Sequence, residues 1–232
     1  IKLANGLNTI GNYAFSGCIN MSTIEMDISS NLTAIGNHAF YDCERLKGFA
    51  VPINVRVLCD SAFEACYTLG SNPNSPATNL DLCAQGQAVS LNYIGNNVFK
   101  DCTSLSSIIS KATTPPTIDS STFDEKVKSI PVIVPNGCKA SYQASDVWKD
   151  FKGIIEEGES LPNDTKIEVD GICYIITNNV ERTVSVTYSL SEDGYKGKRS
   201  IVIPESVIYG GFTYQVTSIG KAAFSDCIAL TN

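Results

Sequence analysis

Residues 10–18, IGNYAFSGC, decide the fold, because close copies of this stretch recur along the chain. The copies are IGNHAFYDC at 35–43, LCDSAFEAC at 58–66, IGNNVFKDC at 94–102 and IGKAAFSDC at 219–227. The phenylalanines at 15, 40, 63, 99 and 123 are separated by 25, 23, 36 and 24 residues. A repeat of this length is typical of solenoids, in which each repeat is one coil that buries its apolar face against its neighbours.

The register of the repeat extends beyond the nine residues. Each cysteine is followed by an apolar residue three positions on, and then by an apolar-x-apolar segment such as Ile24-x-Met26 or Phe49-x-Val51. This alternation predicts a short strand with inward apolar and outward polar side chains. Pro52 ends one such strand, because proline cannot continue a ladder. We expect the glycine of the motif to form a tight turn, and the phenylalanine to fill the interior.

The segment from Ile118 keeps the register with altered chemistry, which predicts the last coil of an array. Beyond it we expect a short helix with Asn136 as its N-cap. Trp148 and Phe151 are expected to close the open end, since terminal repeats need a cap. Because a terminal coil has one neighbour, we expect truncation of Phe123 to cost less than truncation of Phe40.

The full pattern, I-G-x-x-A-F-x-x-C-x-x-L-x-x-I-x-I-P, resembles the BspA-type leucine-rich repeats of bacterial surface proteins. The resemblance covers most of residues 1–135 and 201–232. It implies an α/β solenoid, a leucine-rich repeat array with short parallel strands. Residues 169–190 resemble the β-rich segment that often opens such arrays. Alternation predicts antiparallel strands there, over 166–169, 172–177 and 183–190.

Three parts follow from this organisation. Residues 1–155 are expected to form the repeat array with its C-terminal cap, and the acidic, polar stretch 156–164 a linker. Residues 165–232 are expected to form a small antiparallel β opening segment and the first repeat of a further array. The Pro- and Asn-rich stretch 70–93 is expected to be a surface insertion.

Composition argues against several classes of partner. The formal net charge is −7, from 17 basic and 24 acidic side chains, without a Lys/Arg cluster that could bind phosphates. We therefore expect no nucleic-acid partner. The apolar runs are too short to cross a bilayer, so no membrane insertion of this segment is expected. Residues from Ile1 on lack the charged start and apolar region of a signal peptide, so we expect any export signal to lie outside this chain.

No catalytic, cofactor-binding or metal-binding motif is found, and we predict no enzymatic activity, no cofactor and no metal. The single histidine, His38, is interpreted as a turn or surface residue, and Glu156 and Glu157 as solvated. The nine cysteines include no C-x-x-C pair. Reduced thiols in the core are favoured over disulfides or metal ligands for the repeated cysteines, which are Cys18, Cys43, Cys66, Cys102 and Cys227.

The resemblance implies an exported, non-enzymatic protein, extracellular or at the cell surface, that takes part in adhesion or protein binding. The partner would be a host or bacterial extracellular protein. In leucine-rich repeats the outward strand residues usually line a concave face, and the candidate contact residues are Lys2, Thr23, Glu25, Ala50, Ser107 and Ile109. They share no common chemistry, so an ordinary solvated face explains them equally well. A structural stalk without a ligand is the alternative function.

The two ends of the sequence form a continuous repeat. If Asn232 is read directly into Ile1, the result is CIALTNIKLANGLNTIGNYAF, which keeps the period. We therefore expect the coil ending at Asn232 to stack on the coil beginning at Ile1. A cut coil exposes a strand edge, and stacking on a neighbouring molecule would give head-to-tail self-association.

Overall fold

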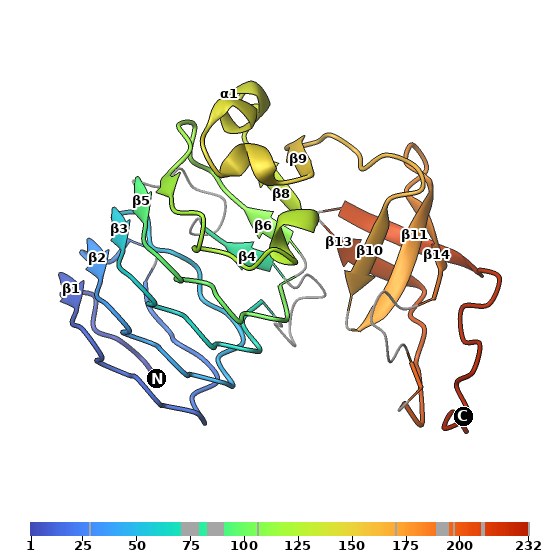
Figure 1. Cartoon of the computed structure of the whole chain (residues 1–232), viewed down its shortest axis with the longest axis horizontal. Coiled ribbons are helices and arrows are strands. Elements are labelled where there is room, and N and C mark those ends of the chain that lie inside the picture. Colours follow the sequence, from blue (N-terminus) through green and yellow to red (C-terminus); the bar gives the residue numbers. More distant parts are fainter. Residues whose placement is uncertain are drawn as a thin grey trace. The chain divides into compact units, whose positions relative to one another are not determined.

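The computed structural model describes residues 1–27, 29–70, 79–82, 91–105, 107–169, 171–188, 195–196, 198–209 and 212–231. The chain divides into two compact units, Ile1–Gly158 and Glu159–Asn232 (Figure 1). Most of the expected surface insertion and the terminal Asn232 lie outside the described residues.

The first unit is a solenoid with two parallel sheets (Figure 1). One sheet consists of two-residue strands in the order β1 (Thr9–Ile10), β2 (Ala34–Ile35), β3 (Val57–Leu58), β5 (Tyr93–Ile94) and β7 (Thr117–Ile118). The other runs β4 (Asn79–Asp81), β6 (Ser107–Ile109), β8 (Pro131–Val134) and β9 (Gly153–Glu156). Each strand pairs with the equivalent strand of the next coil, so the sequence period is also the stacking period.

The second sheet continues towards the N-terminus as single parallel bridges. Lys2 pairs with Glu25, Thr23 with Gly48, and Ala50 with Asp81. The predicted apolar-x-apolar segments therefore lie in one ladder. The predicted leucine-rich repeat solenoid with short parallel strands is confirmed. It contains little helix in the described part, namely η1 (Val127–Ser129), α1 (Lys139–Ala144) and η2 (Trp148–Asp150).

A column of stacked aromatic rings forms the centre of this unit. The ring centroids of consecutive members, Phe15, Phe40, Phe63, Phe99 and Phe123, lie 5.2, 5.1, 5.9 and 5.2 Å apart. Aromatic pairs at such distances stabilise by about 0.5–1.5 kcal/mol beyond the burial of their surface. The column therefore holds neighbouring coils in register as well as filling the interior.

The cap closes the column as predicted. Trp148 and Phe151 are buried and their rings lie 6.2 and 5.5 Å from that of Phe123. The indole N–H of Trp148 donates a hydrogen bond to the carbonyl oxygen of Pro116 at 2.7 Å. Phe123 thus has aromatic partners on both sides, so the expectation of a single neighbour was wrong. The expected N-cap Asn136 was also wrong, because α1 has Cys138 at its N-cap without a side-chain capping bond.

The glycine of the motif has a different role from the predicted turn. A Cβ atom on Gly36 would lie 2.7 Å from the backbone nitrogen of Asn12, and one on Gly95 would lie 2.9 Å from that of Asp60. Glycine is needed here because successive coils approach closely. The left-handed residue comes two positions later, at Tyr13, His38, Ser61 and Asn97, with φ between 54° and 58°.

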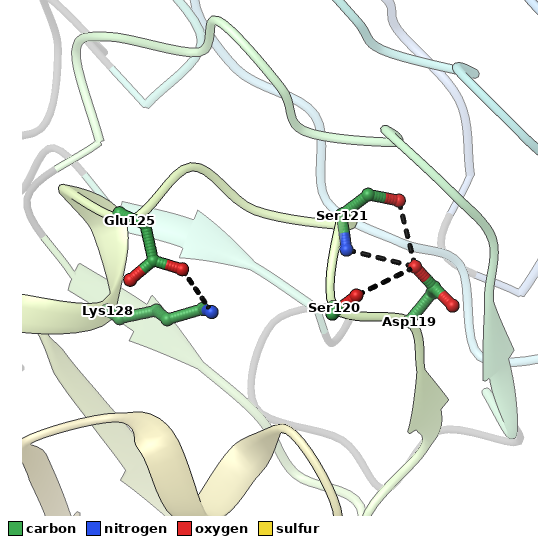
Figure 2. A network of polar contacts seen from close by, with 5 residues as sticks. All are labelled: Asp119, Ser120, Ser121, Glu125 and Lys128. Atoms are coloured by element: carbon green, nitrogen blue, oxygen red, sulfur yellow. Dashed lines mark hydrogen bonds and ion pairs between the residues drawn. The ribbon is translucent and has the colours of Figure 1, made fainter.

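The coil that begins at Ile118 replaces this turn by side-chain hydrogen bonds (Figure 2). Asp119 stands in place of the glycine, and its Oδ1 accepts bonds from the Ser121 N–H at 3.0 Å and the Ser121 hydroxyl at 2.9 Å. The bond from the Ser121 N–H is the main reason why the pKa of Asp119 lies below its usual value. Such a turn needs no left-handed residue. In η1 nearby, Lys128 is paired with Glu125 at 2.6 Å.

The second unit is a mixed sheet in the order β10 (Lys166–Val169), β11 (Ile172–Asn178), β12 (Thr183–Val186), β14 (Phe212–Ile219) and β13 (Ser206–Tyr209). The expected antiparallel pairing of the first three strands is confirmed, although β12 ends at Val186 within the described residues. β14 runs parallel to β12, and the N–H of Gly220 donates to the carbonyl oxygen of Val186 at 2.7 Å.

The last copy of the motif is preceded by two strands that the repeat pattern did not predict. Residues 201–204 form no strand, whereas β13 and β14 form a hairpin that the repeat pattern did not predict. In the first unit, the residue at this position of the motif pairs with another coil. Here that residue is Ile219, which ends β14 and pairs with Val186 of β12. Strand β12, at the centre of this sheet, therefore takes the place of a preceding coil.

Candidate protein-binding surface

The N-terminal part of the second ladder gathers four of the candidate contact residues. Leu3 N–H donates to the carbonyl oxygen of Glu25 at 2.8 Å, and Glu25 N–H donates to that of Ile1 at 2.7 Å. These bonds hold the outward side chains of neighbouring coils at strand spacing. The exposed candidates on this stretch are Lys2, Thr23, Glu25 and Ala50.

The other two candidates lie on β6. Ile109 is half-buried, and Ser107 is fully buried at 0% exposure, so Ser107 does not reach the surface in this structure. Asp81 lies between Ala50 and Ile109 in the ladder, as the partner of both. Sequence reasoning omitted Asp81, although the pattern Leu80-x-Leu82 places it at the same outward position. The assignment of a contact face to these residues stays a prediction.

The repeated cysteines form hydrogen bonds between coils. The thiols of Cys43, Cys66 and Cys102 each donate to the carbonyl oxygen of the phenylalanine one coil earlier, at 3.2 Å in all three cases. Burial raises the pKa of Cys43 to about 11, and it also raises the pKa of Cys66 and Cys102. A thiol held neutral in this way is a poor nucleophile and a poor metal ligand.

The expected burial of the cysteines is confirmed for these three and is wrong for Cys18, which is exposed, while Cys227 is half-buried. The thiol needs a preceding coil that offers a carbonyl oxygen, and Cys18 belongs to the first coil of this sequence. All cysteines in the described residues are free thiols. Cys83 lies outside the described residues.

His38 lies in the turn of its coil, between two tyrosines. Its ring stacks on Tyr13 at 4.8 Å between centroids and is tilted against Tyr41 at 5.4 Å. Nδ1 of His38 is buried without a hydrogen-bond partner. The predicted turn position is confirmed, and the ring packs as part of an aromatic surface that the sequence did not reveal.

The two glutamates interpreted as solvated have structural contacts instead. Glu156 is the last residue of β9, and its Oε1 accepts a bond from the Lys139 N–H at 3.1 Å. Glu157 forms an ion pair with Lys111. Glu156 therefore joins β9 to the cap helix α1, and Glu157 joins the end of the solenoid to the coil that carries Lys111. The boundaries 1–155, 156–164 and 165–232 stay a prediction.

Neither a metal-ion site nor a membrane-spanning helix is found in the described part of the chain. No group of three or more His, Cys, Asp or Glu side chains there is arranged to hold a metal ion. Among the same residues, no helix has the length and apolar character that crossing a bilayer requires.

The stacked parallel strands and the recurring motif define a leucine-rich repeat protein. A family model described as the BspA type leucine rich repeat region, with six copies, matches residues 1–82 and 86–145. The chain belongs to this family.

Two solved structures are similar to this chain. A leucine-rich repeat protein of T. pallidum is 19% identical, with a TM-score of 0.47, over 68% of this chain and 70% of that chain. A leucine-rich cell surface protein of Faecalibacterium prausnitzii is 19% identical, with a TM-score of 0.35, over 99% of this chain and 58% of that chain. Comparison with curated proteins finds no match.

Proposed function

We propose that this chain is an extracellular or cell-surface module that binds a protein partner through its repeat surface and catalyses no reaction. The observation that carries the proposal is the exposed row Lys2, Thr23, Glu25 and Ala50 on a ladder fixed by backbone hydrogen bonds. A rigid row loses little conformational entropy when a partner binds.

Two further points support the proposal. The chain belongs to a repeat family, and extended solenoid surfaces are suited to contact with large partners. The F. prausnitzii relative is described as a cell surface protein. On this basis the partner is a host or bacterial extracellular protein. The buried, neutral thiols have a structural role, because they bond to carbonyl oxygens of neighbouring coils.

Head-to-tail self-association through Ile1 and Asn232 is a second part of the proposal. Asn232 lies outside the described residues, so the support is the continuous repeat alone. Sedimentation of the full chain over a wide concentration range tests it. Growth into longer assemblies with concentration is expected, and a constant monomer mass at all concentrations would exclude it.

Binding is tested with the immobilised full chain against purified host extracellular proteins and bacterial surface proteins. For any protein that binds, the charge exchange Lys2→Glu with Glu25→Lys is expected to weaken binding by about tenfold or more. The matched exchange Lys196→Glu with Glu205→Lys, at two exposed residues of the second unit, leaves the net charge equally unchanged and should have no effect.

Two outcomes count against the proposal. If no protein of either set binds, the stalk alternative is favoured. If binding occurs and both exchanges leave it unaltered, the partner does not use the strand ladder.

A further inference from the structure

An aromatic row lies on the turn side of the solenoid, on residues that differ from those of the strand ladder. We call Tyr13, His38, Tyr41 and Tyr67 the turn-side aromatic row. The first three form a continuous stack across two coils. The tyrosines are exposed, by 61% for Tyr13, 37% for Tyr41 and 41% for Tyr67. Aromatic side chains with one accessible face are frequent anchors in protein interfaces.

Three carboxylates act electrostatically on Tyr67, at one end of this row. The pKa of Tyr67 is raised, first by loss of hydration and then by the negative charges of Asp42, Asp101 and Glu44, with a smaller contribution from Tyr41. These groups come from coils on both sides of the coil that carries Tyr67. The same set of charges that disfavours a tyrosinate favours a cation near the ring.

The backbone holds this arrangement in place. Asp42 N–H donates to the carbonyl oxygen of Glu64, and Ala65 N–H donates to that of Lys100, both at 2.9 Å. Asp42, Ala65 and Asp101 occupy the same position of successive coils and share the left-handed conformation, with φ of 58°, 60° and 61°. Asp42 and Asp101 therefore flank Ala65, two residues before Tyr67.

The cations of this region do not cancel the three carboxylates. Lys100 is paired with Glu64 at 3.5 Å, so these two charges offset each other. Arg45 follows Glu44 in the sequence and is exposed. Even with Arg45 and Lys47, the two cations that follow Glu44 in the sequence, three carboxylates leave an excess of negative charge, in a chain whose net charge is −7. A metal ion is not the occupant that the geometry suits, since the described residues contain no ligand group for one.

We propose that this surface binds a lysine- or arginine-bearing extended segment of a protein partner, with one cationic side chain over the Tyr67 ring and the carboxylates of Asp42 and Asp101 beside it. A cation over an exposed aromatic face is attracted by the ring, and nearby carboxylates add a charge-assisted contact. The inference rests on the proposed function in that it assumes a protein partner. It assigns a surface distinct from the strand ladder.

The test measures fluorescence anisotropy of a labelled Gly/Ser peptide that carries three arginines, titrated with the full chain. The same peptide with citrulline, a neutral isostere, is the control probe. Tyr67→Leu keeps every charge and should weaken arginine-peptide binding by about two- to fivefold, as expected for an exposed cation–π contact. Asp42→Asn with Asp101→Asn should weaken it by about three- to tenfold.

Matched variants separate this site from the general negative charge. Asparagine tolerates the left-handed conformation at 42 and 101, so the double variant should fold, which circular dichroism checks. Asp150→Asn with Glu181→Gln removes the same charge from exposed positions elsewhere, and Tyr93→Leu removes an exposed tyrosine from β5. Both are expected to bind the peptide as the unaltered chain does.

The inference is overturned if the citrulline peptide binds equally well, or if the matched variants lose as much affinity as the site variants. It is also overturned if the arginine peptide does not bind. None of these results decides the strand-ladder proposal, which depends on the charge exchange at Lys2 and Glu25.

Discussion

The thiol of Cys66 donates a hydrogen bond to the carbonyl oxygen of Phe40, 3.2 Å away on the preceding coil. That oxygen also accepts a bond from the N–H of Cys43 in its own coil, at 3.2 Å. The cysteine and phenylalanine of the motif are therefore joined across coils as well as within one. The rings stack from coil to coil, and the thiols connect the same coils beside them.

Replacement of Cys66 by alanine should lower the free energy of unfolding by about 1–2 kcal/mol, because a buried thiol and its hydrogen bond are lost. Cys18→Ala is the control, since Cys18 is exposed, and should change stability by less than about 0.5 kcal/mol. Denaturant unfolding of both variants provides the measurement. Equal effects at the two positions would contradict a role for the bond between coils.

Stability should fall as the pH rises above about 9. An unfolded cysteine has a pKa of about 8.5, whereas burial raises the pKa of Cys43 to about 11 and raises that of Cys66 and Cys102 as well. Because the folded pKa is the higher one, the stabilising contribution is complete below the unfolded pKa. For Cys43 this contribution is lost as the pH rises towards 11. Each thiol lowers the free energy of unfolding by up to about 1.4 kcal/mol per pH unit in this range.

Denaturant unfolding between pH 8 and pH 10.5 measures this loss. The variant Cys66→Ala should show a shallower decrease, since one titrating thiol is absent. A stability that stays constant over this range, or an identical slope in the variant, would contradict the assignment of the thiols to the core.

Phe40→Ala should cost about 3–5 kcal/mol, because the ring is fully buried and stacked on Phe15 and Phe63. Phe15→Ala should cost about 1–2 kcal/mol, since Phe15 is half-buried and stacks on one phenylalanine of this column. Phe123→Ala should resemble Phe40→Ala, given its contacts with the cap. Thermal and denaturant unfolding rank the three variants by stability. A larger loss of stability for Phe15→Ala than for Phe40→Ala would contradict the assignment of the phenylalanine column to the core.

Gly36→Ala should destabilise by about 1–3 kcal/mol, because the new Cβ would lie 2.7 Å from the backbone nitrogen of Asn12. Gly11→Ala is the matched control at the same motif position, with nothing within 4 Å of its Cβ. It should change stability by less than about 0.5 kcal/mol. If both substitutions behave alike in denaturant unfolding, close approach of the coils is not the reason for the glycine.

The period, the strands and the cap could be predicted because each coil must bury the same side chains against the next. The role of the motif glycine could not be predicted, because a close approach of two coils and a tight turn both favour glycine. The hairpin of β13 and β14 was missed because the motif describes a coil that pairs with another coil. At Gly220, β12 supplies the partner instead.

The candidate site was predictable only in part. Alternation identifies outward positions such as Glu25 and Ala50, but exposure depends on residues distant in sequence, and Ser107 proved to be buried. The turn-side aromatic row was missed for another reason. Tyr41 follows the phenylalanine of its coil and Tyr67 follows the cysteine of the next, so an alignment of repeats places them in different columns.

Hydrogen–deuterium exchange of the full chain, alone and with a protein partner found by the binding screen, tests the central claim most directly. We expect the partner to slow exchange in the outward ladder around residues 1–3, 23–26 and 48–51, or in the turns around 41–44, 65–67 and 101. Exchange in β10 to β14 should stay unaltered. Slowed exchange confined to residues 166–219, with no change in either part of the repeat array, would contradict it.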